Sequence, residues 1–371
     1  NVIVVEKTKL NKLEYVCKKE NICLDIIGII NNSTNIRVEF KDKIIYDLPI
    51  NEVVKPKLQK EYLLEETGYC FNKNEISPLD CSLFYPFLSK VLQNLDVCSK
   101  RFLVNKVDRS VTGLVVQQQS VGPFQTPISN YSLTATSFFS EVGIASAIGE
   151  RPILGLIDSD ACANMTVGEM ITNMMGVYVG ELTNIKCSGN WMWALSKKGE
   201  SDKLVSTAMS MIKAMKCLGL SIDGGKDSLS MKTTIHGKDV YSPNNLVLTG
   251  YAHVKNFKKR VTPDLKRTDS NLIYIKFSEK ERIAGSVYQR ERGKIGGEPP
   301  NLNMDDLARL SNTWEIIQKM IYKNEILSLH DVSDGGLITT VTEMAISGDK
   351  GVEIFINKNP SKINDYLFNE E

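Results

Sequence analysis

The chain has 371 residues, of which 42% are hydrophobic and 24% are charged, and its formal net charge is +1. This composition is ordinary for a globular protein with a sizeable core, and the length suggests roughly two or three domains. The balanced charge provides no long-range field for nucleic acid or an anionic membrane, and no apolar run approaches the roughly 20 residues of a membrane-spanning helix.

The first hundred residues carry two different patterns. Apolar runs at 2–5 and 26–30 suggest that residues 1–50 finish a domain. Residues 51–100 are charged and mixed, which is typical of a connector, and they contain one predicted helix around 83–95. Because the chain starts with Asn and stops soon after a strand-like run, we expect it to be a piece of a longer protein.

Residues 101–260 are predicted to form a domain that mixes strands and helices. Ser201 and Gly219 bracket one predicted helix, and residues 166–179 form another with an apolar side that includes Met170. Short apolar runs predict buried strands at three places: 114–116, 153–157 and 246–248.

Residues 261–371 form the last predicted domain. Two short apolar runs, 272–275 and 326–329, predict strands, and residues 337–348 have helical spacing. A further amphipathic helix is predicted from residues at helical spacing: Leu307, Leu310, Trp314, Ile317 and Ile321. The mixture of elements along the chain indicates an α+β or α/β fold.

The segment His-Asp-Val-Ser-Asp-Gly-Gly-Leu at 330–337 lies where a predicted strand meets a helix. Its glycines allow close backbone approach, and the helix N-terminus offers free N–H groups to an anion. Its carboxylates would repel a bare phosphate, so a divalent cation between them makes the best sense. The pattern therefore indicates a metal–nucleotide site, and an acidic capped turn explains it equally well.

Three other clusters could carry chemistry. Glu169 and Asn173 are four residues apart on a predicted helix, and two oxygen ligands on one face suit Mg²⁺, although a polar helix face is the alternative. The glycine turn predicted at 223–228 is explained almost as well by a plain hairpin. Two tryptophans around a predicted turn at 186–193 favour core packing.

Other kinds of site are disfavoured by the sequence. Neither a P-loop nor a GxGxxG motif occurs. The eight cysteines form no CxxC pair, which disfavours a zinc site and indicates a reducing, cytoplasmic compartment.

Six strings occur in one order along the chain: DRSVTG at 108–113, VGPFQTP at 121–127, VGEMITN at 167–173, KCSGNWMWA at 186–194, GGKDSLSM at 224–231 and HDVSDGGL at 330–337. This series resembles the formylglycinamide ribonucleotide amidotransferase family, also called phosphoribosylformylglycinamidine synthase, in its large single-chain form. The resemblance runs from about 100 to 355, more weakly over 1–100, and covers only the second half of the synthetase region.

The resemblance implies an α+β fold of the aminoimidazole-ribonucleotide-synthetase type, in which each half has an A domain and a B domain. Residues 1–50 would be the C-terminal part of the first B domain and 51–100 a connector. Residues 101–260 would be the second, nucleotide-binding A domain, and 261–371 a truncated second B domain. The first half of the synthetase and the glutaminase domain would lie outside this chain.

The resemblance also implies two groups of site residues. One group would hold Mg²⁺ and ADP: Ser129 and Ser333 at the nucleotide, and Asn130, Glu169, Asn173 and Asp331 at the metal. The other would belong to the catalytic site: Asp158 and Gly225 near ATP, and Ser228 near the substrate. Large members usually carry Asp at the position of Asn130, so Mg²⁺ should bind less tightly here. The catalytic group is implied by the smaller, glutaminase-free members, in which a metal-binding Asn stands at the position of Lys226, so metal ligation there is not carried over. The family's catalytic histidine falls outside this chain.

The implied activity is an ATP-dependent ligase of purine biosynthesis. It would use ATP and glutamine-derived ammonia to convert formylglycinamide ribonucleotide into the amidine, and this chain alone would be inactive. Two alternatives stay open: a non-catalytic half that holds ADP and Mg²⁺ as a scaffold, and another ATP-using enzyme of the same superfold, such as a selenophosphate synthetase or a thiamine-monophosphate kinase.

Overall fold

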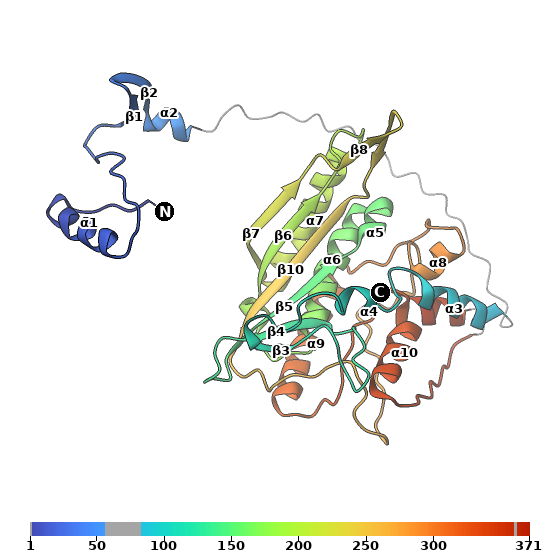
Figure 1. The fold of residues 1–371 in the computed structure, drawn as a ribbon. Helices are drawn as coiled ribbons and strands as arrows, with labels where there is room; N and C mark the ends of the chain where they lie inside the picture. The colour runs from blue at the N-terminus through green and yellow to red at the C-terminus, as the bar shows by residue number, and fades with distance from the viewer. Residues whose placement is uncertain (1, 56–82, 360–361) are drawn as a thin grey trace. The chain divides into compact units, whose positions relative to one another are not determined.

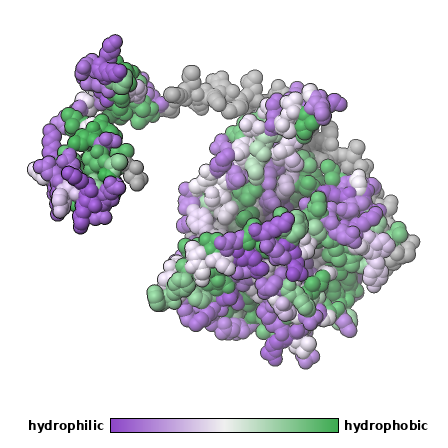
Figure 2. All heavy atoms as spheres, viewed as in Figure 1, coloured by the Kyte–Doolittle hydropathy of each residue, from purple (hydrophilic) through white to green (hydrophobic). Residues whose placement is uncertain are grey.

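The computed structural model describes residues 2–55, 83–359 and 362–371, and the chain divides into two compact units, residues 1–62 and 63–371 (Figure 1). The first unit contains η1 (Lys7–Lys9), α1 (Leu10–Lys19) and an antiparallel hairpin of β1 (Asn35–Phe40) and β2 (Lys43–Pro49), followed by α2 (Ile50–Val54). The apolar run at 26–30 is exposed, with Ile27 80% accessible, and Figure 2 shows green apolar residues on the surface of this unit.

The second unit is built on a six-stranded sheet in the order β3-β4-β5-β10-β6-β7. All neighbours in this sheet are antiparallel except β6 and β7, which are parallel. The strands are β3 (Val115–Gln117), β4 (Tyr131–Ala135), β5 (Gly143–Glu150), β6 (Lys186–Met192), β7 (Ser221–Ser228) and β10 (Asn245–Val254). A mixed sheet with separate helices confirms the predicted α+β class.

One face of the sheet is covered by α6 (Ser159–Met174), which lies against α7 (Glu200–Leu218). The alternating burial of β4 and β10 places one set of side chains in the core beneath these helices. Gly149 lets α6 approach β5 closely, because a Cβ there would lie 2.1 Å from the carbonyl oxygen of Thr166. A third helix, α9 (Met304–Tyr322), packs on α7, and its Trp314 donates from Nε1 to the carbonyl of Gly180 at 2.7 Å.

Three helices gather around a second, smaller core. Tyr288 stacks on Phe368 with ring centroids 4.4 Å apart, and Phe84 and Phe87 pack against them. These rings belong to α3 (Phe84–Gln93), α8 (Val287–Glu291) and α11 (Ile363–Phe368). These ring contacts tie residues near the chain end to the segment around 84–93.

The other helical segments of the second unit are α4 (Arg101–Val104), η3 (Val111–Gly113), α5 (Pro152–Ile157), η4 (Leu182–Asn184) and α10 (Gly336–Gly348). β8 (Lys232–Ile235) and β9 (Lys238–Tyr241) form a hairpin.

The predicted helices at 83–95, 201–218 and 337–348 are confirmed, as is the amphipathic helix that buries Trp314. The helix predicted at 166–179 is confirmed in part, because α6 starts earlier, at Ser159, and ends at Met174. The five apolar positions predicted for α9 are all buried, because the helical period places them on one face, and α9 packs on α7. The cap predicted at Ser201 is wrong, since Gly199 occupies the N-cap. Within the described ranges, no helix is long and apolar enough to cross a membrane.

Several predicted strands and turns are wrong. Residues 153–157 form α5, because Pro152 starts a helix at its first position and the short apolar run suits a buried helix as well as a strand. Residues 272–275 and 326–329 pair with no strand in the described part of the chain. The turns predicted within 186–193 and 223–228 are strands β6 and β7. Glycines in both strands allow them to approach closely, since a Cβ on Gly225 would lie 2.5 Å from the carbonyl oxygen of Gly189.

Candidate functional site

Helix α6 brings two of the predicted ligands to the end of β5. Its N-terminus is capped by Asp158, whose carboxylate accepts the N–H of Ala161 at 2.8 Å. Glu169 accepts the backbone N–H of Glu150 at 2.7 Å, and Asn173, one turn later, donates to the carbonyl of Ile148 at 2.9 Å. Both side chains are therefore fixed against the last residues of the strand.

Arg151 follows β5 directly and is the centre of a buried ionic network. Its guanidinium lies 3.1 Å from Glu169, 3.1 Å from Asp334 and 3.8 Å from Glu370, while its side chain is only 7% exposed. Burial opposes its charge, but these carboxylates keep the pKa of Arg151 above its usual value. The network joins α6 to the 330–337 segment and to the end of the chain.

Burial dominates the two carboxylates that are most enclosed in this network. It raises the pKa of Glu169 to about 8, even though Arg151 and the N–H of Glu150 favour the ionised form. Burial also raises the pKa of Glu370 to about 8, with Asp334 adding to the effect. With both groups ionised, the carboxylates would carry more negative charge than Arg151 neutralises, so an additional cation would stabilise their ionised forms.

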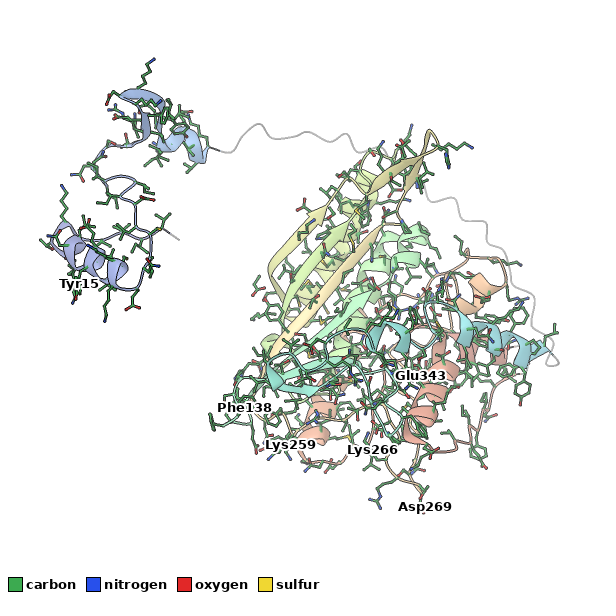
Figure 3. The ribbon with its side chains drawn as sticks, in the orientation of Figure 1. Tyr15, Phe138, Lys259, Lys266, Asp269 and Glu343 are labelled. Atoms are coloured by element: carbon green, nitrogen blue, oxygen red, sulfur yellow. The ribbon has the colours of Figure 1, made fainter. Side chains whose placement is uncertain are left out.

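Asp331 lies in a second hydrogen-bonded group. Asn130 donates from Nδ2 to its Oδ1 at 2.8 Å, and His330 contacts the same oxygen from Nδ1 at 2.9 Å. The other ring nitrogen of His330 lies 3.0 Å from Glu343 of α10, which is labelled in Figure 3. Carboxylates only accept hydrogen bonds, so both ring nitrogens must carry hydrogen and His330 is an imidazolium.

The charges of this group support one another. Burial lowers the pKa of His330, but its hydrogen bonds to Asp331 and Glu343 outweigh it and raise that pKa to about 9. Burial raises the pKa of Asp331, but His330 and Arg151 hold it below its usual value, and Ser333 adds a hydrogen bond. Asp331 is therefore an ionised, buried carboxylate.

The start of α10 is a glycine turn whose backbone is held by Glu370. Gly335 and Gly336 have φ values of 84° and 72°, and a Cβ on Gly336 would lie 2.6 Å from the backbone of Phe368. Glu370 accepts the N–H of Gly335 at 2.7 Å and that of Val287 at 2.8 Å. The N–H of Gly336 also donates to the carbonyl of Ser333 at 2.9 Å, so an incoming anion would need the later N–H groups of the first turn.

The structure brings some of the predicted site residues together and leaves others apart. Asn130, Asp331 and Ser333 contact one another through Asp331, and Glu169 joins them through Arg151. Ser129 instead donates from its hydroxyl to the carbonyl of Tyr131. Three predicted residues have no recorded hydrogen bond or ion pair to this group in the described part of the chain: Asp158 at the start of α6, and Gly225 and Ser228 in β7.

The donor set fits a divalent cation that is shared with a phosphate. The Oδ1 atom of Asn130 is buried and has no hydrogen-bond partner among the described residues, and it belongs to the side chain that contacts Asp331. Such an oxygen beside an ionised carboxylate is a suitable ligand for Mg²⁺, which commonly takes one or two protein carboxylates plus phosphate and water. In the described residues no group of three or more His, Cys, Asp or Glu side chains could enclose a metal ion alone. Glu169 would have to exchange its contact with Arg151 to join.

Sequence reasoning missed Arg151, His330, Glu343 and Glu370 as members of this site. The string Glu150-Arg151-Pro152 ends an alternating strand with charged residues before a proline, and it is the signal that could have drawn attention to Arg151. Glu370 carried no such signal, because its partners are backbone groups far away in sequence.

Comparison with known proteins identifies the family. Residues 99–253 match the model described as FGAR-AT PurM_N-like domain, and residues 273–371 match the AIR synthase related protein, C-terminal domain. A probable phosphoribosylformylglycinamidine synthase of Arabidopsis thaliana, named chloroplastic/mitochondrial, is 37% identical over 387 residues, which cover 100% of this chain and 27% of the relative. The chain belongs to the phosphoribosylformylglycinamidine synthase family.

Other synthases of this family give the same result. The Dictyostelium discoideum synthase is 40% identical over 354 residues, covering 89% of this chain and 25% of its own length, and the human synthase is 39% identical over 88% and 24%. The chain therefore spans about a quarter of the length of these curated relatives.

Solved structures share the fold at low sequence identity. Thermotoga maritima PurL complexed with AMPPCP aligns with a TM-score of 0.51 at 15% identity, over 86% of this chain and 44% of that one. The same protein complexed with ATP aligns with a TM-score of 0.50 at 14% identity, over 86% and 43%. These matches support the predicted aminoimidazole-ribonucleotide-synthetase-like architecture.

Proposed function

We propose that this chain is part of an ATP-dependent phosphoribosylformylglycinamidine synthase, which converts formylglycinamide ribonucleotide and ammonia into formylglycinamidine ribonucleotide. The observation that carries the proposal is 37% identity to a synthase along the whole chain. It favours a synthase over a selenophosphate synthetase or a thiamine-monophosphate kinase, because relatives with the synthase name match at 33–40% identity.

The proposed role of this part of the protein is to hold a nucleotide with Mg²⁺. Asn130 and Asp331 would be the first ligands, with Glu169 and Asn173 joining from α6, and Ser333 near the nucleotide. Ser129 is also proposed to contact the nucleotide, once its hydroxyl leaves the carbonyl of Tyr131. When bound, Mg²⁺ would supply positive charge that neutralises the phosphates.

The catalytic chemistry is proposed to need residues beyond this chain. An amide oxygen is a poor leaving group, so the γ-phosphoryl group of ATP is transferred to it and ADP is released. Ammonia then attacks the amide carbon and phosphate leaves. Protein groups mainly position the reactants and balance charge in such a reaction. Asp158 and Gly225 near ATP, and Ser228 near the substrate, are the proposed contributions of this chain.

The test is ATP hydrolysis that depends on both formylglycinamide ribonucleotide and ammonium, measured for the chain alone and for the full-length protein that contains it. We expect activity in the full-length protein and none in the chain alone. Turnover by the isolated chain would contradict the assignment of catalysis to another part, and substrate-independent hydrolysis by the full-length protein would contradict the synthase reaction.

A second candidate function is a non-catalytic ADP-holding scaffold that stabilises the synthetase. It is favoured because the polar side chains of the site are already paired within the protein. Arg151 forms an ion pair with Glu169, and Asn130 and His330 form hydrogen bonds with Asp331. A ligand that binds the folded state alone stabilises it by mass action. Protein purified with Mg²⁺ would be denatured and its released nucleotide quantified on an anion-exchange column. Stoichiometric ADP supports the scaffold, and release of none counts against it.

The partners and location of the parent protein follow from the same proposal. Ammonia would come from a glutaminase domain, and the second unit would pack with the missing first half of the synthetase. We also propose a cytoplasmic location, while noting that the Arabidopsis relative is named chloroplastic/mitochondrial.

A further inference from the structure

A polar cavity of about 460 Å³ lies between the edge of the sheet and the end of α9. Its walls come from β3, from the segment after β10, and from the segment that includes the end of α9. The lining residues are Gln117, Arg260, Val261, Thr262, Lys266, Ile321, Asn324, Ile326 and Leu327. None of them belongs to the candidate nucleotide site, so the cavity needs its own explanation.

The cavity has a positive lining. Arg260 and Lys266 are its charged residues, and no carboxylate is among the described residues that line it. Figure 3 labels Lys266 together with Lys259, whose ammonium lies 3.1 Å from Oδ1 of Asn324. Because that oxygen already accepts a hydrogen bond, the amide nitrogen of Asn324 remains to donate.

Arg260 is held in place without being neutralised. Its guanidinium donates to the carbonyl of Phe257 at 2.8 Å and to that of Val116 at 3.4 Å. No carboxylate in the described ranges lies within ion-pair distance of it. Backbone carbonyls fix the orientation of a guanidinium but do not cancel its full charge, so the side chain is ready for an anion.

Lys266 is paired within the protein, and burial disfavours its charged form. Its ammonium lies 2.6 Å from Oδ1 of Asp264 and 2.8 Å from the hydroxyl of Thr262. Burial lowers the pKa of Lys266, and Asp264 only partly opposes this effect. An anion in the cavity would therefore stabilise the charged form of Lys266 as well as that of Arg260.

We propose that this cavity binds the phosphate group of a small organic phosphate, with Arg260 as the principal contact and Lys266 and Asn324 as supporting donors. Asp264 balances the charge of Lys266, so the uncompensated positive charge of the lining is that of Arg260, whose planar guanidinium can donate two parallel hydrogen bonds to a phosphate. The apolar part of the ligand would lie against Ile321 and Leu327. The volume falls in the range of about 300–1,000 Å³ that is usual for small-molecule sites.

The site is independent of the proposed nucleotide function, because its ligand-binding residues differ from those around Asp331. The experiment is isothermal titration of the chain with phenyl phosphate, which combines a phosphate with an apolar ring, and with phenol, which has the ring alone. We expect saturable binding of phenyl phosphate, competition by inorganic phosphate, and no binding of phenol. Absence of phenyl phosphate binding, or equal binding of phenol, overturns the proposal.

Two variants locate the binding, and a third is the matched control. Arg260→Gln should weaken phenyl phosphate binding about tenfold or more, since it removes charged hydrogen bonds. Asn324→Asp puts a negative charge into the lining, keeps the oxygen that Lys259 contacts, and should weaken binding too. Lys258→Gln removes the same charge from a neighbouring exposed residue whose partner is Glu141, and should change nothing.

These outcomes separate a specific cavity from general charge attraction. If Arg260→Gln and Lys258→Gln weaken phenyl phosphate binding equally, the basic residues at 258–260 attract anions without a defined site, which contradicts the proposal. Unchanged affinity in both Arg260→Gln and Asn324→Asp contradicts it as well. If Arg260→Gln fails to fold, Asn324→Asp alone decides, because the asparagine is exchanged for a side chain of the same shape.

Discussion

Replacing Arg151 by methionine tests the central ionic network of the candidate site. The substitution removes the charge and keeps an unbranched side chain of moderate length. At an effective dielectric constant of about 20, contacts of 3.1 Å and 3.8 Å correspond to gross attractions of about 4–5 kcal/mol each. Asp334 contributes less, because its side chain is 44% exposed and solvent screens it.

The net effect is smaller than the gross attraction, because burying the guanidinium costs free energy in the native protein. Removing one partner from a buried ionic network usually destabilises a protein by about 3–5 kcal/mol, since the remaining charges lose their counter-ion. We therefore expect Arg151→Met to lower the free energy of unfolding by about this amount. The loss of stability should be smaller at about pH 5 than at about pH 8, because Glu169 and Glu370 are protonated at the lower pH and then carry no charge that Arg151 must balance.

Urea unfolding followed by tryptophan fluorescence measures this effect in the second unit alone, since the three tryptophans of the chain all lie there: Trp191, Trp193 and Trp314. The matched control is Arg309→Met, which removes a half-exposed arginine and should cost only about 0–1 kcal/mol. Adding Glu370→Gln to Arg151→Met should restore part of the loss, because it removes one stranded carboxylate. Equal losses for Arg151→Met and Arg309→Met would refute the reasoning.

Three further changes test other parts of the structure. Because folding raises the pKa of His330 from its ordinary value of 6.5 to about 9, protonated His330 stabilises the protein fully below pH 6.5, and this stabilisation is lost as the pH rises through about 9. His330→Gln should make the free energy of unfolding less dependent on pH over this window. A pH profile equal to that of the parent chain would count against this. Asn130→Asp places a second carboxylate beside Asp331, so the melting temperature should fall without Mg²⁺ and rise more on adding MgCl₂ than in the parent chain. Gly149→Ala should destabilise by about 3 kcal/mol or more, because its Cβ would meet a backbone carbonyl of α6. A Cβ added at Gly224 has no neighbour within 4 Å in the described part of the chain, so Gly224→Ala should be close to neutral in the same urea assay.

The helices were predictable because their apolar positions repeat over many turns. Trp314 and its neighbours in α9 define one buried face over 19 residues, and tertiary packing agrees with that pattern. Short apolar runs predict strands correctly at 114–116 and 246–248, where β3 and β10 form, but wrongly at 153–157 and 326–329, because so few positions cannot distinguish a strand from a helix or an extended loop. The glycine turn predicted at 223–228 was wrong, because Gly225 allows β7 to approach β6 closely instead of forming a turn.

The candidate site could be predicted in part. Glu169 and Asn173 share a helix face by spacing alone, and Asp331 belongs to a distinctive string. The contact between Asn130 and Asp331 spans 201 residues, so no local pattern could reveal it. The role of Arg151 depends on three carboxylates brought from three different elements, which only the tertiary fold assembles.

The order of strands in the sheet has a consequence for how the chain acquires its structure. β10 lies between β5 and β6, yet it is the last of the six strands to leave the ribosome. Until residue 254 has been synthesised, the edges of β5 and β6 that β10 will join have no partner. Pairing across such long sequence separations is slow, and open strand edges are prone to associate with other chains. The nascent second unit should therefore depend on chaperones most strongly after β6 has left the ribosome and before β10 has done so.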